Sequence, residues 1–595
     1  MKTLIIAEKP SVGRDIARVV GAAKRGEGYL HGDNYIVSWA IGHLATLKEP
    51  EDYNEHHKKW RMADLPIIPT QMGLKPMPKT QKQLTLIKKM MDSKEVGDII
   101  CATDSGREGE LIFRYIYEWA NCEKPVKRLW ISSLTDAAIK KGLSTMRDGS
   151  EYDKLYASAR CRAEADWLVG MNATRAFTLK HNDLLPMGRV QTPTLALLAA
   201  RQQEIDAFVA QNYWEVVATF LTANGETYAG TWIDAEGETK ILKQEEAEAI
   251  KEKILGDAQV ASVEKEEKRQ SPPQLFDLTE LQREANRKLG LSAKATLDVA
   301  QSLYEKHKLI TYPRTDSRYI SDDMQPQLNP TISALQTISA YQSHADYLLG
   351  LSELPITKRI VNDAKVTDHH AIIPTGIKKM PALNANEAAV YDLIVRQFLA
   401  AFFPAYVYEV TTIITEAKGE RFQSKGRVEK NAGWTAVIRD TSTDTPLPAV
   451  QKGEAVTATE AEVLHKKTQP PKPYTEATLL SAMENAGRFV EDEALKEALK
   501  ASGLGTPATR AAMIEKLIAS GYVERRKKAL APTEKGLRLI TLVPPELRSP
   551  ETTGKWERAL SRIADGEMEP TRFMDSIKRY VRYLIDCAAK RNATI

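Results

Sequence analysis

Near the N-terminus, short continuous apolar runs alternate with stretches of helical spacing. Residues 2–7 fit a buried strand, and apolar residues at 12, 16, 19 and 20 follow at helical spacing until Gly21. A second apolar run spans 96–103 and precedes a helix over 111–119, and residues 126–131 indicate a third strand. Strands that alternate with helices are typical of an α/β sheet, so the pattern predicts one in the first 150 residues.

The pattern changes in the middle of the chain. Residues 213–233 form two apolar–polar runs around Asn224-Gly225, a dipeptide typical of hairpin turns. Residues 407–415 and 454–464 also resemble strands, whereas the segment between, about 275–403, has mainly helical spacing. A strand-rich unit interrupted by a helical insertion predicts a hinged arm.

Within the helical insertion, the spacing predicts helices over 278–289 and 293–307 and an extended segment over 309–312. Helix, turn, helix and strand is the outline of a winged-helix module. A weaker copy covers 506–518, 521–523 and the basic run 525–528. Such modules commonly bind nucleic acid, but they also serve as plain scaffolds.

Composition and charge narrow the class of protein. A chain of 595 residues exceeds the size of a single core, about 250–300 residues, so several domains are expected. Four scattered cysteines without a C-x-x-C pair argue against a zinc ribbon and for a reducing cytosol. Residues 501–595 hold 18 Lys/Arg against 11 Asp/Glu, which suggests a polyanionic partner, although a solvated face gives similar runs. No run approaches the roughly 20 apolar residues of a membrane span.

Two acidic residues follow predicted strands directly. Glu8 comes after the first strand and Asp104 after the second, and ligands of open α/β sheets bind at this edge. Carboxylates placed there suit Mg²⁺, and Glu8 could also transfer a proton. Lys9 could stabilise charge on a phosphate. The alternative is that these acids only cap helices.

Tyr312 lies between an apolar run and the segment Pro313-Arg314-Thr315-Asp316-Ser317, which has no obvious packing purpose. Pro313 favours an extended backbone at Tyr312, and the guanidinium of Arg314 suits a phosphate. We therefore consider Tyr312 a candidate nucleophile that attacks a phosphodiester. As a nucleophile, the tyrosine hydroxyl needs a nearby cation to help it ionise. The alternative is a half-buried tyrosine at a strand end.

The remaining polar motifs are less specific. A helix over 157–175 leaves Arg162 and Arg175 in solvent, and in 186–194 Arg189 and Gln191 face one groove if the backbone is extended. A turn with exposed polar groups explains the second motif equally well. His369, one of two adjacent histidines, is a candidate phosphate ligand.

Taken together, these motifs resemble the type IA DNA topoisomerases, and within them the bacterial topoisomerase III branch. The resemblance covers nearly the whole chain and rests on IAEKPS (6–11), ATDSGREGE (102–110), GRVQTP (188–193), ITYPRTDS (310–317), HHAIIPT (369–375) and GLGTPATR (503–510).

The resemblance implies a multidomain α/β plus α+β fold, a toroidal clamp that opens through its β-rich arm. Its parts would be a Toprim domain (1–150), a DNA-binding helical domain (151–210 and 471–595), the arm (211–274 and 405–470) and a winged-helix domain with the nucleophilic tyrosine (275–404). Tyr312 would form a 5′-phosphotyrosine, another strand would pass through the break, and religation would need no ATP.

The resemblance also assigns roles to single residues. Tyr312, Glu8, Lys9 and Arg314 would be catalytic, and Glu8, Asp104 and Glu108 would be the metal ligands. The DNA path would be lined by Arg175, Gly188, Arg189, Val190, Gln191, Thr192 and His369. The substrates would be single-stranded DNA and negatively supercoiled or catenated DNA. A helicase and a single-strand-binding protein are candidate partners of a monomer in the bacterial cytoplasm, at the nucleoid and without a membrane.

One departure from the family pattern concerns the metal site. The family's acidic motif reads Asp-x-Asp-x-Glu, but Gly106 stands where the second Asp is expected. One Mg²⁺ held by Glu8 and Asp104 is therefore expected, and zinc is not, because the chain lacks a cysteine tail. A Toprim nuclease or primase, or a catalytically silent single-stranded DNA clamp, are the alternative functions.

Overall fold

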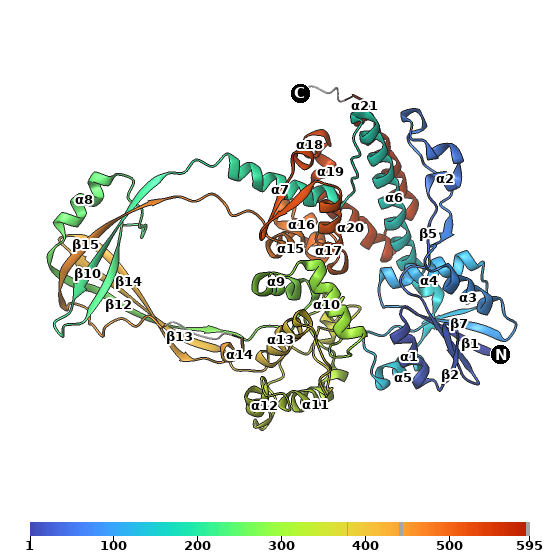
Figure 1. Ribbon diagram of the computed structural model, residues 1–595, viewed down its shortest axis with the longest axis horizontal. Helices are drawn as coiled ribbons and strands as arrows, with labels where there is room; N and C mark the ends of the chain where they lie inside the picture. Colours follow the sequence, from blue (N-terminus) through green and yellow to red (C-terminus); the bar gives the residue numbers. More distant parts are fainter. Residues whose placement is uncertain (378, 439–443, 591–595) are drawn as a thin grey trace.

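A seven-stranded sheet with its flanking helices forms the N-terminal part of the protein, residues 2–148, which we call the sheet domain (Figure 1). The computed structural model describes residues 1–377, 379–438 and 444–590. The strand order is β2-β3-β4-β1-β7-β8-β9, and β1 (Lys2–Ala7) lies in parallel between β4 (Tyr35–Trp39) and β7 (Val96–Ala102). Ala7 pairs with Ala102, so the carboxyl ends of β1 and β7 lie side by side. The predicted α/β sheet is confirmed.

Helices cover both faces of this sheet. The side chains of β1 and β7 alternate between two apolar clusters, one with α3 (Gln81–Asp92) and α4 (Arg107–Ala120), the other with α1 (Pro10–Val19) and α5 (Asp136–Ser144). The predicted third strand is shorter than expected, because β8 spans only Val126–Arg128. Antiparallel strands complete both sides of the sheet, with β2 (Lys24–Gly26) and β9 (Arg147–Asp148) at the edges and β3 (Tyr29–His31) between β2 and β4.

Six strands close into a barrel at the far end of the molecule, in the order β10-β11-β14-β13-β12-β15. The predicted hairpin is confirmed as β10 (Asn212–Leu221) and β11 (Thr227–Ile233), with Gly225 at φ +83° in the turn. The two later strands are β13 (Tyr406–Ala417) and β15 (Ala455–Lys467). Sequence patterning missed β12 (Gly256–Gln270) and β14 (Glu420–Asn431), because both carry many charged, solvent-facing residues.

The helical insertion has its own apolar core, built by α9 (Leu278–Leu289), α10 (Ala293–Glu305), α11 (Gln325–Gln336), α12 (Gln342–Leu349) and α13 (Ala385–Ala400). The expected strand at 309–312 is reduced to an isolated bridge between Ile310 and Pro374, next to one between Phe276 and Ile372. The segment that carries Tyr312 is therefore held by the 369–375 loop. We call this insertion, residues 275–404, the tyrosine unit.

A third core joins α6 (Asp153–His181) and α7 (Gln191–Asp206) to the C-terminal helices from α15 (Glu476–Glu484) to α21 (Pro570–Lys590). The weaker helix-and-strand copy appears here as α17 (Pro507–Ala519) with the hairpin β16 (Val523–Arg526) and β17 (Ala529–Pro532). We call residues 151–210 and 471–595 the helical unit. Across the described ranges, no helix is long and apolar enough to cross a membrane.

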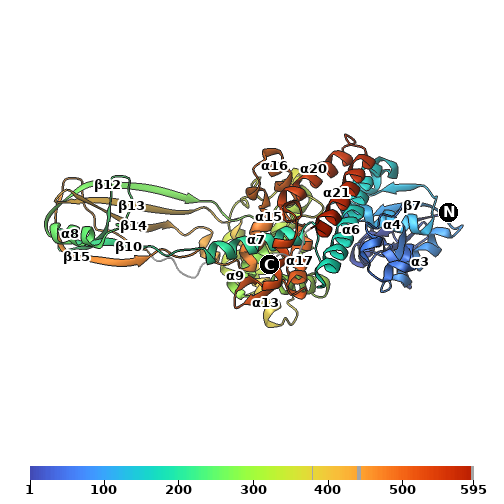
Figure 2. The ribbon, with the colours of Figure 1, turned by 90° about the horizontal axis from the view of Figure 1, so that it is seen from above.

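The chain traces a ring (Figure 1). It enters the barrel from α7 through β10, leaves through β12 to α9, returns from α13 through β13, and leaves again through β15 to α15. Figure 2 shows the barrel, the helical body and the sheet domain in a row along the long axis. The toroidal clamp predicted from the resemblance is confirmed in this arrangement.

Candidate active site

Glu8, Lys9 and Asp104 form a compact cluster at the carboxyl edge of the sheet. The backbone N–H of Asp104 donates to Glu8 Oε2 at 2.9 Å, and Lys9 Nζ donates to Asp104 Oδ2 at 2.7 Å. Lys9 Nζ lies 3.9 Å from Glu8 Oε1. The cluster arises because β1 and β7 are neighbours in register and each ends just before its acidic residue. Neither acid caps its helix: no side-chain cap is present at the start of α1 or α4.

Burial and charge set unusual protonation states in this cluster. Burial, and then the negative charge of Asp104, raise the pKa of Glu8 to about 8. Burial would also raise the pKa of Asp104, but His369 and the Lys9 ammonium outweigh it and hold that pKa well below its usual range. Burial opposes the charge on Lys9, yet Asp104, Tyr312 and Glu8 together raise its pKa. At neutral pH the cluster therefore holds a protonated Glu8 beside a carboxylate and an ammonium.

A buried arginine that the sequence analysis did not identify fixes the loop that carries Asp104. The guanidinium of Arg128 donates to the carbonyl oxygens of Thr103 at 2.8 Å and Asp104 at 2.7 Å. Its Nε also donates to Glu110 Oε2 at 3.0 Å, and both side chains are almost fully buried. Asp104 is thus held at its backbone as well as at its carboxylate.

Tyr312 lies against this cluster from across the interface with the tyrosine unit. Lys9 Nζ is 3.4 Å from the centroid of the Tyr312 ring. The ring centroids of His369 and Tyr304 lie 4.4 and 5.4 Å away. Burial raises the pKa of Tyr312, and the Lys9 ammonium opposes that shift. Lys9 is therefore a cation in direct contact with this ring.

His369 belongs to the same cluster. Its Nε2 lies 2.9 Å from Asp104 Oδ2 while its ring packs on Tyr312, so it contacts both halves of the site. The sequence motif indicated a phosphate or DNA ligand but not this position. Asp368, which sequence reasoning did not single out, places its carboxylate beside Gly106.

Two expected members of the site lie elsewhere. Glu108 Oε1 pairs with His43 Nε2 at 2.7 Å, and its side chain is 70% exposed. The structure therefore places the Glu108 carboxylate against His43 and not in a group of three with Glu8 and Asp104, since the described residues hold no such metal-binding group. Arg314 is exposed, and its Nη2 donates to Gln301 on α10 at 3.0 Å rather than approaching the phenol.

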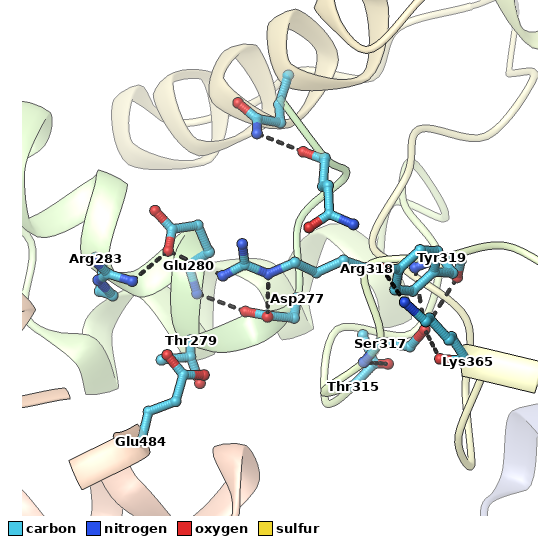
Figure 3. A network of polar contacts seen from close by, with 12 residues as sticks. Asp277, Thr279, Glu280, Arg283, Thr315, Ser317, Arg318, Tyr319, Lys365 and Glu484 are labelled. Atoms are coloured by element: carbon cyan, nitrogen blue, oxygen red, sulfur yellow. Dashed lines mark hydrogen bonds and ion pairs between the residues drawn. The ribbon is translucent and has the colours of Figure 1, made fainter. Parts of the chain in front are cut away.

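A polar network holds the segment that follows Tyr312 (Figure 3). Arg318 donates to Asp277 Oδ2 at 2.7 Å and to Glu280 Oε2 at 3.1 Å, and Asp277 also caps the N-terminus of α9. Thr315 Oγ1 donates to the carbonyl of His369 at 2.9 Å, while its own carbonyl accepts from Leu278 N–H at 3.0 Å. These contacts fix Tyr312 and His369 relative to each other.

The residues expected along the DNA path have buried side chains in the helical unit. Arg189 has a 2% exposed side chain, and its guanidinium contacts Asp166 at 2.9 Å and Glu557 at 3.2 Å. Gln191 and Thr192 are buried, Gly188 and Val190 are half-buried, and all four belong to the start of α7 or its approach. In this structure the side chains of Arg189, Gln191 and Thr192 are therefore not available to DNA.

The prediction that Arg175 remains in solvent is wrong. Arg175 is 5% exposed, and its Nη1 donates to the carbonyl of His57 at 2.8 Å. Its guanidinium also lies over the ring of Trp60, 5.1 Å from the centroid. The helical pattern of α6 could not reveal this burial, because the covering segment comes from the sheet domain.

The cluster supplies part of the ligand set that a divalent cation needs. Glu8 and Asp104 offer adjacent carboxylates, the donor type that Mg²⁺ prefers. In the described part of the chain, no three His, Cys, Asp or Glu side chains are grouped closely enough to hold a metal. The ammonium of Lys9 supplies the positive charge against Asp104 in this arrangement.

Comparisons with known proteins agree with this geometry. A family model described as DNA topoisomerase matches residues 150–575, and the Toprim domain matches residues 3–134. DNA topoisomerase 3 of Bacillus subtilis (strain 168) is 45% identical over 600 residues, covering 98% of this chain and 81% of the relative. DNA topoisomerase 3 of Bacillus cereus (strain ATCC 14579) is 44% identical over 598 residues, with the same coverage.

The fold is also that of a solved structure. Full-length topoisomerase I from Thermotoga maritima superposes with a TM-score of 0.72 over 99% of this chain and 91% of that one, at 22% identity. A nuclease or primase would share the Toprim match but not the match over 150–575. The chain belongs to the type IA DNA topoisomerase family.

Proposed function

We propose that Tyr312 is the nucleophile with which this topoisomerase cuts one DNA strand. The phenol would release its proton to solvent, and its oxygen would attack a backbone phosphate, forming a phosphotyrosine at the 5′ end while the bond to the 3′ oxygen breaks. Another strand would pass through the gap, and attack by the 3′ hydroxyl would restore the phosphodiester. The phosphotyrosine ester conserves the free energy of the broken phosphodiester bond, so religation needs no ATP. The observation that supports this role is the ammonium of Lys9, 3.4 Å from the Tyr312 ring and 2.7 Å from Asp104.

Glu8 is the residue best suited to move the proton. With a pKa of about 8, its carboxyl is largely protonated at neutral pH and can donate to the departing 3′ oxygen. In religation, the resulting carboxylate would take the proton back from the 3′ hydroxyl. Lys9 keeps its charge throughout, because its pKa is raised, and would stabilise the negative charge that develops on the phosphate.

Asp104 would hold one Mg²⁺ together with Glu8, whose carboxylate would bind the ion once it has given up its proton. When bound, the ion would supply positive charge against the DNA phosphates. We assign Glu108 and Arg314 no direct contact with the reacting atoms in this closed arrangement, since each is engaged elsewhere. His369 would orient Asp104 and the phenol ring together.

We further propose the four-part division, 1–150, 151–210 with 471–595, 211–274 with 405–470, and 275–404, as the moving parts of the clamp. The substrates would be single-stranded regions of negatively supercoiled or catenated DNA, bound by a monomer at the bacterial nucleoid. A helicase and a single-strand-binding protein would expose such regions. The ring of Figure 1 supports this proposal, because a passed strand needs an enclosure.

The substitution Tyr312→Phe tests the central proposal. It removes only the hydroxyl and keeps the ring that packs on Tyr304 and His369. We expect no relaxation of negatively supercoiled plasmid and no protein-linked DNA after a denaturant quench, with single-strand binding retained. Tyr304→Phe, which loses a hydroxyl that contacts Ser11 at 3.2 Å, is the matched control and should still form the adduct. Cleavage by Tyr312→Phe would exclude Tyr312 as the nucleophile.

A further inference from the structure

Trp130 lies at the edge of the sheet that carries the active site. It follows β8, whose carboxyl end lies beside that of its parallel neighbour β7. On one side of it, the N–H of Leu129 donates to a carbonyl oxygen of β7 at 2.9 Å. On the other side, the carbonyl of Ile131 accepts from Ser105 Oγ, in the loop that carries Asp104, at 2.8 Å. The indole is therefore held in a fixed place next to that loop.

The contacts of Trp130 gather on one side of its indole. The ring of Tyr152 is nearly parallel to it, with centroids 5.0 Å apart and an interplanar angle of 20°. The guanidinium of Arg128 lies 4.9 Å from the Trp130 centroid and 5.9 Å from that of Tyr152. Arg128 and Tyr152 are too close to each other to lie on opposite faces of the indole. Both therefore pack from one side and leave Trp130 42% exposed.

Core packing does not explain this tryptophan. Its neighbours Leu129 and Ile131 pack into the apolar cluster with α1 and α5, but Trp130 is in none of the apolar clusters of the described residues. Its contact with Arg128 links it instead to the active site, because the same guanidinium donates to the carbonyl of Asp104 at 2.7 Å. A large aromatic face, open to solvent and backed by a cation next to this site, is suited to stack on a nucleotide base.

We propose that Trp130 is a stacking platform for one unpaired base of the DNA strand that is cut. The inference rests on the proposed function, which brings a single strand to this edge of the sheet, and adds a contact with a base to the contacts with the phosphate. Bases within a duplex already stack on their neighbours, so the platform would favour single-stranded over duplex DNA. Arg128 and Tyr152 hold the indole in place, so it would lose little side-chain freedom on stacking.

Replacing the indole tests this proposal through binding alone. Every chain carries Tyr312→Phe, so the phenol that we propose to form the adduct is absent, and fluorescence anisotropy of labelled oligo(dT) measures the affinity. Trp130→Leu, which still covers Arg128 with an apolar side chain, should weaken binding by about fivefold or more, the effect of losing one stacked base. Trp130→Phe keeps an aromatic face and should bind within about threefold of the parent chain.

Trp60→Leu is the matched control. Trp60 is 37% exposed and lies under the guanidinium of Arg175, 5.1 Å from its ring centroid, but Arg175 donates to His57 and not to the active-site loop. Trp60→Leu should therefore bind oligo(dT) like the parent chain. The dependence of affinity on salt concentration should have the same slope in all four chains, because no phosphate contact is removed. Thermal melting of each variant checks that it is folded.

Photocrosslinking identifies the stacked residue directly. Oligo(dT) in which single thymines are replaced by iodouracil should crosslink to Trp130 of the parent chain on irradiation, and mass spectrometry of the digest locates the link. Because this experiment needs no substitution of Trp130, it decides the case even if Trp130→Leu melts early.

Three results would overturn the proposal: equal affinities of Trp130→Leu and the parent chain, equal losses in Trp130→Leu and Trp130→Phe, or crosslinks at other residues without one at Trp130. A changed salt slope in Trp130→Leu would also do so, since the loss would then come from a displaced Arg128 and not from stacking. If Trp130 stacks as expected but Tyr312→Phe still forms an adduct, only the nucleophile is refuted.

Discussion

A substitution of Arg189 can distinguish between two roles of this residue, a buried structural contact and a contact with DNA. The family resemblance places this residue along the DNA path, whereas the structure buries its guanidinium between Asp166, Glu557 and the ring of Trp556. The substitution Arg189→Met keeps most of the aliphatic stem over Trp556 and removes the charge. If Arg189 is a buried structural residue, this variant loses stability; if Arg189 is a DNA contact, the variant loses affinity for DNA.

The structure sets the size of the expected effect. Removing one partner of a buried ion pair costs about 3–5 kcal/mol. Glu557 would keep Arg107 at 3.0 Å, and Asp166, with a 41% exposed side chain, would regain water. We therefore expect Arg189→Met to lower the free energy of unfolding by the lower end of this range, about 3 kcal/mol. For a unit of 150–250 residues, 1 kcal/mol lowers the melting temperature by about 2–4 °C, which gives a fall of about 6–12 °C for the helical unit.

Differential scanning calorimetry of the full chain measures this fall, and hydrogen exchange in α6 and α20 (Pro550–Ala564) locates it. Arg558→Met is the matched control, because Arg558 is the exposed neighbour of Glu557 on α20 and should change stability by less than about 0.5 kcal/mol. If Arg189→Met melts like the control but loses affinity for single-stranded DNA, Arg189 is a DNA contact and the structural interpretation is refuted.

Two further predictions concern the tyrosine unit. Asp323→Ala removes the acceptor of Ser133 Oγ at 2.7 Å and Thr135 Oγ1 at 2.8 Å, so spin-label distances between α5 and α11 should broaden. Asp322 is exposed and takes no part in this contact, so Asp322→Ala should leave these distances unchanged. His344 packs on Phe403, and burial lowers its pKa. As the pH falls, the histidine of the unfolded state therefore binds a proton at a higher pH than that of the folded state, and stability decreases below about pH 6.5. His344→Gln should lose less melting temperature between pH 7.5 and 5.5 than the wild type, and an equal loss in both would contradict this assignment.

The parts of the fold that could be predicted are those whose signals are local. The acids after β1 and β7 could be placed together because parallel neighbours end at the same edge, and Asn224-Gly225 marked the first hairpin of the barrel. The strands β12 and β14 lacked the apolar alternation that reveals a strand, because much of their length faces solvent.

The contacts of single side chains could not be predicted from the sequence where their partners lie far away along the chain. The burial of Arg189 depends on Glu557, 368 positions away, and nothing near either residue indicates the pairing. Glu108 follows the family pattern in sequence, but His43, from the loop after β4, draws its carboxylate aside. Gly106 departs from the family pattern in sequence, but only the folded chain brings the carboxylate of Asp368 alongside it.

The cores of the protein indicate where the ring opens. In the described residues, the apolar clusters of the sheet domain extend onto α6 but include no residue of the tyrosine unit. The contacts across that interface are polar or aromatic, such as Ser11 with Tyr304, Asp104 with His369 and Ser133 with Asp323. Each such hydrogen bond contributes about 0.5–3 kcal/mol, and water can replace it when the surfaces part. Separating the sheet domain from α6 would instead expose a buried apolar core, at about 25 cal/mol per Å². The sheet domain therefore parts more easily from the tyrosine unit than from α6, and Glu8 and Tyr312 lie on opposite sides of the weaker interface.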